Sequence, residues 1–585
     1  MESHPLKRRP MELVSKFSLS PVADGEKPAG KRTLNIEKII SGRPFFCSFL
    51  ITVVLFSTIF SFFKSYFQLV DDVYVLLLLK GQGLSNTGCE FNLLQNPILS
   101  IVLKHLYQRL PSVEWYSSFL IFSLMFGTWG ILAALQLGTN ALFKSALFIL
   151  GSFILEIQFA AAIQWTVVAS VAGMGGLLLI AAVWRRENSE FLKPALGLAF
   201  VLVMISVLIR TDAFMLMVLV SIPMFAFLFW KVKFAPARQK IAKSLMVISA
   251  FALAVIFLGW VYYCQNPEWK KASEFLDHYG HLNVLRNPVY NENTEPVFKS
   301  IGWSPNDLDL FKNLYFMDSD TYSFEKIDLL QKFFPRFTFD KNPNETFVRM
   351  FSNPGTHILL SFLLVVFWFM EIEVFSFVVL NLVFTGFILL FCRLYLWMPP
   401  RIYIPCLFYQ NAIFVFFSFG QNRVMDLKKA AVKWGIAFGV LFLAFSLFVA
   451  HLGYEGNQYS RYLETQLKKQ MKDLAPREDQ LFVTWASSYP YENIAAFDNG
   501  EIFQNFNVLP IDWFQRTPIT TAMLNRFSLK NLFRDLMDNP KVFLICSPRQ
   551  WTLYQTYMRE KYNQSVRFEV YFHSDQFNVL SVRSH

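Results

Sequence analysis

Apolar segments long enough to cross a lipid bilayer recur along most of the first 452 residues of this chain. A helix needs about 20 apolar residues to cross hydrocarbon about 30 Å thick, and it satisfies its own backbone hydrogen bonds there. Charged residues make up only 17% of the sequence, against about 25% in an average soluble protein. The pattern therefore predicts a polytopic α-helical membrane protein with about 11 transmembrane helices. The predicted helices are 44–67, 114–138, 142–161, 163–184, 192–209, 213–230, 243–263, 354–371, 374–394, 400–419 and 433–452.

Lysine and arginine residues predict the orientation of this bundle. Residues 1–43 are basic, contain proline and glycine, and lack apolar periodicity, which is typical of a disordered cytoplasmic tail. Basic residues also fill the connections 185–193, 231–243 and 423–433. The positive-inside rule then puts the N-terminus inside and the C-terminus outside. The frequent Phe and Ile residues and the absence of a retention signal favour a bacterial cytoplasmic membrane.

Three segments are expected outside the bilayer. Residues 68–113 predict two short helices on the outer surface of the transmembrane bundle 44–452, and the loop 264–353 predicts a small folded cap. Residues 453–585 predict a small extracytoplasmic α/β domain that serves recognition or structure. Within the loop we expect helices at 307–317 and 323–334, and in the last segment helices at 458–474 and 550–562 and strands at 481–486, 542–547, 566–572 and 577–582.

Charge and cysteine content exclude some functions and leave others open. The net charge of +11 follows from the topology, because no basic stripe interleaved with aromatic residues indicates nucleic-acid binding. The six cysteines lack zinc-type spacing, and no metal ligand set is predicted. Cys89, Cys264 and Cys392 fall on the predicted outer side, where one pair could form a disulfide.

Two adjacent acids, Asp71 and Asp72, follow the first apolar segment. A carboxylate close to hydrocarbon is energetically costly, which makes this pair a functional candidate. The simpler interpretation is that the two acids mark a helix end that faces water. The pair opens the first predicted surface helix, where the helix dipole favours ionised carboxylates. Asn96 and Pro97 open the second helix with an ordinary cap.

The order of elements along this chain resembles that of the GT-C superfamily of membrane glycosyltransferases. This order is a tail, one span, an outward acidic pair, two surface helices, a dense bundle and an outer C-terminal domain. The chain is most similar to the branch of protein O-mannosyltransferases and aminoarabinose-type lipid A transferases. The matching motifs are Asp71-Asp72 and the stretch Gln95-Asn96-Pro97-Ile98-Leu99. The arrangement of elements is similar over residues 44–452, whereas the motifs themselves cover only about forty residues. The chain departs from the family in having Asp-Asp where Asp-Glu is frequent, and no histidine before Pro97.

This resemblance implies transfer of a sugar from a polyprenyl-phosphate carrier to a glycan, lipid or protein acceptor on the outer side, with inversion. Asp71 would accept the proton of the acceptor hydroxyl, and Asp72 would be its partner. The leaving phosphate would need positive charge, which arginine supplies by bidentate pairing. No cofactor is certain, and a divalent cation stays open.

Arginines at the outer helix ends are the candidate ligands of the carrier phosphate. These are Arg210, Arg393 and Arg401, and each could instead extend toward lipid headgroups. Arg401 is preferred because two prolines fix the turn before it, whereas Asp212 could pair with Arg210. Lys104 and His105 on the second surface helix are weaker candidates that could simply face water.

A polar cluster surrounds the turn between the third and fourth predicted spans. Gln158 and Gln164, with Glu156 and Thr166, could bind sugar hydroxyls, or they could bridge helices. His278 and His281 are interpreted as an exposed pair rather than a metal site.

Two further classes compete with the enzyme. A transporter or flippase for a lipid-linked glycan should show internal repeats and charges near the middle of the membrane, and neither is evident. A non-catalytic membrane scaffold would keep the same topology.

Overall fold

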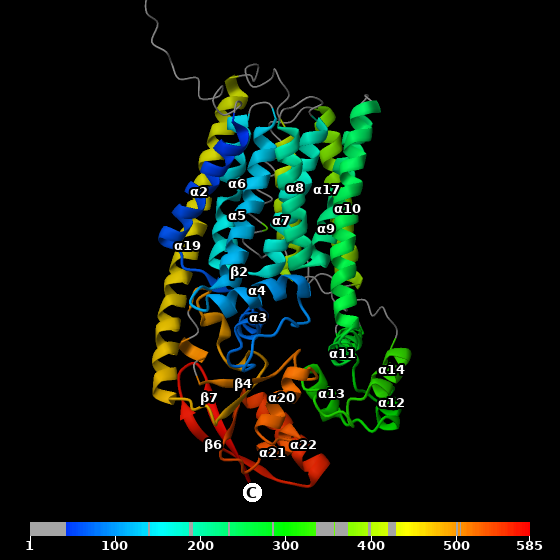
Figure 1. Ribbon diagram of the computed structural model, residues 1–585, viewed down its shortest axis with the longest axis vertical. Helices are drawn as coiled ribbons and strands as arrows, with labels where there is room; N and C mark the ends of the chain where they lie inside the picture. Colours follow the sequence, from blue (N-terminus) through cyan, green and yellow to red (C-terminus); the bar gives the residue numbers. More distant parts are fainter. Residues whose placement is uncertain are drawn as a thin grey trace, which may run out of the picture.

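The computed structural model describes residues 43–585 except 139–140, 186–190, 232–234, 284–285, 335–355, 357–371, 396–398, 419–428, 499–500 and 504. Within these residues, eight helices are long and apolar enough to cross a membrane, and they stand side by side in one bundle (Figure 1). They are α2 (Pro44–Phe62), α5 (Trp115–Gln136), α6 (Ala141–Ala161), α7 (Trp165–Arg185), α8 (Leu192–Ile209), α9 (Thr211–Lys231), α10 (Ala235–Cys264) and α19 (Lys429–Leu474).

The chain is a polytopic helical membrane protein, as its apolar pattern predicts. Two more predicted segments also form helices, α17 (Ile372–Tyr395) and α18 (Pro400–Phe417), which are not among the eight. The predicted span 354–371 lies outside the described residues apart from position 356. The total of eleven stays a prediction.

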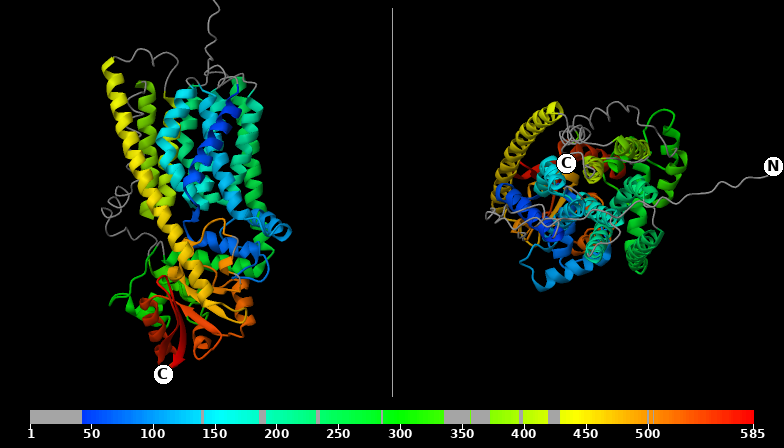
Figure 2. Two further views of the ribbon diagram at one scale, coloured as in Figure 1. Left: turned by 90° about the vertical axis from the view of Figure 1, so that its left-hand side faces the viewer. Right: turned by 90° about the horizontal axis from the view of Figure 1, so that it is seen from above.

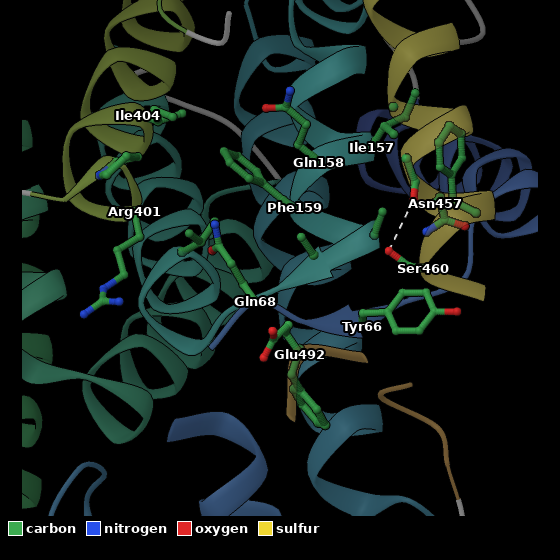
Figure 3. A pocket seen from close by; sticks show the side chains of 18 of the residues that line it. Tyr66, Gln68, Ile157, Gln158, Phe159, Arg401, Ile404, Asn457, Ser460 and Glu492 are labelled. Carbon is green, nitrogen blue, oxygen red and sulfur yellow. Dashed lines mark hydrogen bonds between the residues drawn. The ribbon is translucent and has the colours of Figure 1, made fainter. Parts of the chain in front are cut away.

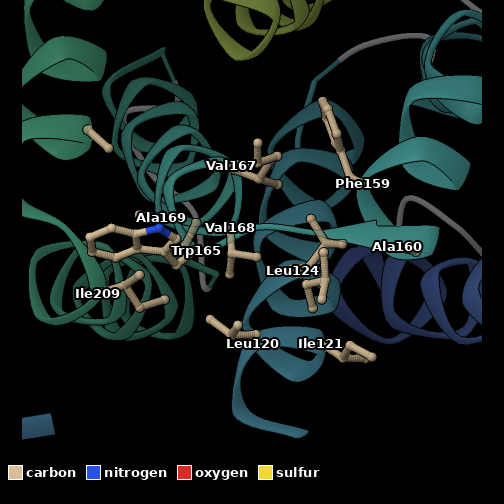
Figure 4. Packing of buried hydrophobic residues seen from close by; sticks show 14 of the residues in the cluster. Leu120, Ile121, Leu124, Phe159, Ala160, Trp165, Val167, Val168, Ala169 and Ile209 are labelled. Atoms are coloured by element: carbon tan, nitrogen blue, oxygen red, sulfur yellow. The ribbon is translucent and has the colours of Figure 1, made fainter. Parts of the chain in front are cut away.

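Helix α7 lies at the centre of the bundle. Every residue from Trp165 to Trp184 is buried, and Val167 and Val168 pack among leucines of α5 and Ile209 of α8 (Figure 4). Close contact with α5 depends on glycines, because a Cβ atom on Gly175 would lie 2.5 Å from the carbonyl oxygen of Gly127. Small residues at such contacts let helix backbones approach each other in membranes.

Two short helices cover the end of the bundle nearest the sheet, which we call the sheet end. They are α3 (Val70–Lys80) and α4 (Pro97–Arg109), and Figure 1 shows them between the bundle and the sheet. The Asn96 side chain caps α4 by accepting a hydrogen bond from the Ile98 N–H. Both helices lie within the predicted segment 68–113, and their place on the outer side of the membrane stays a prediction.

The C-terminal part contains a five-stranded mixed sheet in the order β4-β3-β5-β7-β6. The first three strands in this order are parallel, and β7 pairs antiparallel with both β5 and β6. Four strands and α22 (Pro548–Tyr562) occupy predicted positions, whereas β4 was missed because Pro510 interrupts its apolar run. The strands are β3 (Leu481–Trp485), β4 (Asn507–Ile511), β5 (Val542–Ile545), β6 (Val566–His573) and β7 (Asn578–Ser584).

The two faces of the sheet belong to different hydrophobic cores. Phe482 and Phe543 join the core of the bundle, whereas Leu481 and Trp485 join a second core. This division follows from the alternation of side chains along a strand. The second core also contains helices of the loop after α10 and helices that follow β4, so the loop and the sheet pack as one unit. These helices are α11 (Pro267–Asn283), α12 (Glu295–Ser300), α13 (Pro305–Lys312), α14 (Phe324–Phe333), α20 (Pro518–Arg526) and α21 (Leu532–Leu536).

Helix α19 joins the bundle to the sheet without a break. The sequence predicts a span at 433–452 and a separate amphipathic helix at 458–474, and the structure corrects this to one helix of 46 residues, Lys429–Leu474. Its length is about 69 Å at 1.5 Å per residue. No proline interrupts the segment, and Gly453 and Gly456 remain helical. Figure 2 shows the helix running from the far end of the bundle down to the sheet.

The thiols of Cys89 and Cys264 are free. The side chain of Cys392 lies outside the described residues. A disulfide between Cys89 and Cys264 is therefore not formed.

The contact between α5 and α7 gives a stability prediction. Gly175→Ala forces the two backbones apart, and overpacking of this kind costs about 1–3 kcal/mol. We expect the thermal unfolding midpoint in detergent to fall by several degrees. The control is Gly386→Ala on α17, where an added Cβ meets no described atom within 4 Å. Equal midpoints for both variants would contradict the proposed packing.

Candidate active site

Asp72 is fully buried in the first turn of α3. Its Oδ1 accepts a hydrogen bond of 2.8 Å from the hydroxyl of Tyr116 on α5. Its Oδ2 has no hydrogen-bond partner among the described residues. Burial raises the pKa of Asp72 well above its usual range, and the Tyr116 hydrogen bond only partly opposes this. The structure thus fixes Asp72 in a buried position that favours the neutral carboxyl group.

Asp71 is only half-buried and faces positive charge. Burial raises the pKa of Asp71, and the charges of Arg401 and Arg210 act in the opposite direction. Its carboxylate makes no hydrogen bond or ion pair within the part of the chain that the structure describes. The two arginines therefore favour the negative charge of Asp71 and oppose the effect of burial.

Arg210 is held at the junction of α8 and α9. Its Nη1 donates a hydrogen bond of 2.9 Å to Thr166 Oγ1, and its guanidinium lies 4.5 Å from the centre of the Trp165 ring. This cation–π contact holds the guanidinium beside a desolvated surface. A salt bridge to Asp212 is not formed among the described side chains. Arg210 therefore points toward the start of α7 and the acids of α3.

Arg401 lies in the first turn of α18, directly after Pro399 and Pro400. Its charge acts on both Asp71 and Asp72. Arg393 belongs by its backbone to α17, but its side chain lies outside the described residues. Of the three candidate arginines, the structure brings Arg210 and Arg401 to the acidic pair.

A third acid, Asp512, comes from the sheet and was missed from the sequence. It follows β4, is 5% exposed, and its Oδ1 accepts a hydrogen bond of 2.7 Å from the Trp513 N–H. Burial and the charge of Asp71 raise the pKa of Asp512 well above its usual range. The contact of Tyr74 with Phe514, at 5.7 Å between ring centres, brings this loop against α3. No local motif marks Asp512, because its position depends on that long-range contact.

A cavity of about 610 Å³ lies beside this charged cluster. Its walls come from the ends of α2 and α6, the start of α18, a stretch of α19, and the turn η2 (Tyr491–Asn493) after β3 (Figure 3). Arg401 and Gln68 line it, and Gln68 precedes Asp71 by three residues. Gln158 is also part of the wall, as is Glu492, which the sequence did not indicate. Neither Asp71 nor Asp72 lines the cavity, and Arg401, whose charge acts on both acids, connects its wall to the acidic pair.

Other candidates from the sequence have structural partners. Gln164 caps α7, with its Oε1 accepting from the Val167 N–H, and Glu156 accepts from Thr128 between helices. Lys104 forms a salt bridge of 2.7 Å with Glu90. His105 is exposed and contacts Gln108, and neither Lys104 nor His105 lines the cavity.

Across the described residues, no group of three or more His, Cys, Asp or Glu side chains is placed to hold a metal ion. His278 instead lies 3.4 Å from Asp328 on α14.

No protein-family model and no curated protein matches the chain. Among solved structures, it is similar to the crystal structure of ArnT from Cupriavidus metallidurans bound to undecaprenyl phosphate, with 10% identity, a TM-score of 0.40, and coverage of 94% of this chain and 98% of that chain. The apo crystal structure of the same protein gives 10% identity, a TM-score of 0.40, and coverage of 91% and 97%.

The buried acids make stability dependent on pH. An acid whose pKa is raised in the folded state holds its proton at a pH at which the same acid ionises in the unfolded chain. The free energy of unfolding therefore falls as the pH rises above the unfolded-state pKa of about 3.9. We expect the unfolding midpoint to decline from about pH 4 upward, and Asp72→Asn to flatten that decline, since the amide keeps an acceptor for Tyr116. The exposed Asp473→Asn is the control. A variant D72N with the wild-type slope would contradict the burial of an ionisable group there.

Proposed function

We propose that this chain is a glycosyltransferase that moves a sugar from a polyprenyl-phosphate carrier to an acceptor hydroxyl. The observation that carries the proposal is the position of Asp71, which faces Arg210 and Arg401 beside a cavity of about 610 Å³. A base and a phosphate-binding cation are the two groups that such a transfer needs. The proposal also places this reaction on the outer side of the membrane, with the N-terminus inside.

Asp71 acts as the general base in this proposal. The acceptor oxygen attacks the anomeric carbon, its proton passes to Asp71, and the bond to the phosphate breaks on the opposite face, which inverts the configuration. Arg401 binds the departing phosphate, and Arg210 holds positive charge near Asp71. Asp72 keeps α3 in place through Tyr116.

The cavity also suits an isoprenoid chain. Two glycines of α19, Gly453 and Gly456, line it, and an added Cβ on either would meet no described atom within 4 Å. The wall on α19 is therefore open, and most of the remaining lining is apolar. These apolar residues include Phe63, Phe67, Ile157, Phe159, Ile404 and Pro405.

A transporter for a lipid-linked glycan is the second candidate. The charged groups of the site gather at the sheet end rather than midway along the helices, which favours the transferase. A scaffold without catalysis would leave the acids of α3 without a chemical role.

The first functional prediction concerns the base. Asp71→Asn keeps the size of the side chain but cannot accept a proton, so sugar transfer should fall by about 10²–10⁴-fold. Asp72→Asn should retain much more activity. Transfer from radiolabelled polyprenyl-phosphate sugars would be measured in membranes with equal protein levels. The proposal would be refuted if Asp71→Asn transferred sugar at the wild-type rate. It would also be refuted if the wild type transferred sugar from none of a broad panel of donors.

The second functional prediction concerns the carrier. Gly456→Leu would fill the cavity with a side chain and should abolish binding of polyprenyl phosphate, measured with the purified protein in nanodiscs. The matched control is Gly439→Leu on the same helix, which also has free space for a Cβ but does not line the cavity. Equal binding by both variants would exclude the cavity as the carrier site.

A further inference from the structure

Three polar side chains that line the cavity have unused hydrogen-bonding capacity. Gln68, Gln158 and Glu492 make no side-chain hydrogen bond or ion pair among the described residues. They come from three distant parts of the sequence, and Figure 3 shows them around the same space as Arg401. Gln68 and Glu492 are exposed at the cavity wall and Gln158 is partly buried. Their donors and acceptors are therefore available to a polar ligand that displaces water from the cavity.

Each of these side chains is held by a fixed backbone. Gln68 follows β1 (Tyr66–Phe67), and its backbone N–H donates to Ile163 O at 3.0 Å. Gln158 is in the last turn of α6, next to Phe159, which contacts Phe408. The site is thus built on rigid elements rather than on a long loop.

Glu492 is the exposed residue between two anchored neighbours. Tyr491 is fully buried, shares a hydrogen bond of 3.0 Å with Thr484 and packs on Tyr74 at 5.1 Å. Asn493 donates a hydrogen bond of 3.0 Å to Gln576. Glu492 also follows the carboxyl end of β3, the edge of a parallel sheet at which ligands usually bind.

The chemistry of the three groups selects a ligand class. Amides both donate and accept hydrogen bonds, and a carboxylate accepts two or more, so together they match a set of hydroxyl groups. A second phosphate would be repelled by Glu492, and a simple cation would be repelled by Arg401. A polyhydroxylated sugar satisfies all three groups.

We propose that Glu492, together with Gln68 and Gln158, binds the hydroxyl groups of the sugar carried by the donor, so that the C-terminal sheet supplies the sugar specificity of the site. This inference rests on the proposed function, because the phosphate of the same molecule would lie at Arg401. It assigns to η2 a role in substrate selection.

The test compares binding of undecaprenyl phosphate with binding of its glucosyl and mannosyl derivatives, using the full chain in nanodiscs. The wild type should bind at least one glycosylated carrier about tenfold more tightly than the bare carrier, because hydrogen bonds to a charged group are strong. Glu492→Gln should lose that preference and bind the bare carrier as the wild type does. Gln158→Leu should also reduce the preference.

The control is Glu478→Gln, an exposed carboxylate ahead of β3 that does not line the cavity. The inference is overturned if E492Q keeps the full preference, if it weakens both ligands by the same factor, or if the wild type shows no preference. A wild type that prefers a glycosylated carrier but transfers no sugar would refute the transferase and leave the sugar site intact. If the wild type transfers sugar and its E492Q variant selects sugars normally, the sugar site is refuted and the transferase stands.

Discussion

Helix α3 is covered by the bundle on one side and by the sheet on the other, and every residue from Asp72 to Leu79 is buried. The helix dipole and the free N–H groups of its first turn favour the negative charge of Asp71. Asp72 in the same turn is fully buried and accepts a hydrogen bond from Tyr116. The loop after the C-terminal end of α3 is joined to the sheet by the hydrogen bond from the Val508 N–H to Gly83 O at 3.0 Å. The arginines, the cavity and Asp512 are all positioned relative to this one buried helix.

The apolar pattern predicts the spans well because the length of hydrocarbon fixes the length of an apolar helix. It does not predict that α19 continues past the membrane, since its soluble half carries charge and looks like a separate element. Strand β4 is missed because Pro510 removes a backbone donor, although its partner β3 lies beside it in the sheet. Local sequence signals therefore predict elements better than they predict the connections between them.

The candidate site shows the same limit. Asp71 and Arg401 could be selected from the sequence, since each is a charged residue at the end of an apolar segment. Asp512 and Glu492 could not, because each is an ordinary acid in a loop until the sheet docks against α3. Lys104 was a weaker candidate from the sequence, and its contact with Glu90 becomes visible only in the fold.

Helix α19 contributes to both the cavity and the support of the sheet, so its register is constrained at two places. Each residue inserted between Gly456 and the sheet would lift the sheet by about 1.5 Å and turn it by about 100° relative to the bundle. Glu492 would then leave the wall that it shares with Arg401. The segment from Gly456 to Leu474 thus works as a spacer of fixed length, in which a change in residue number is more damaging than a change in residue type.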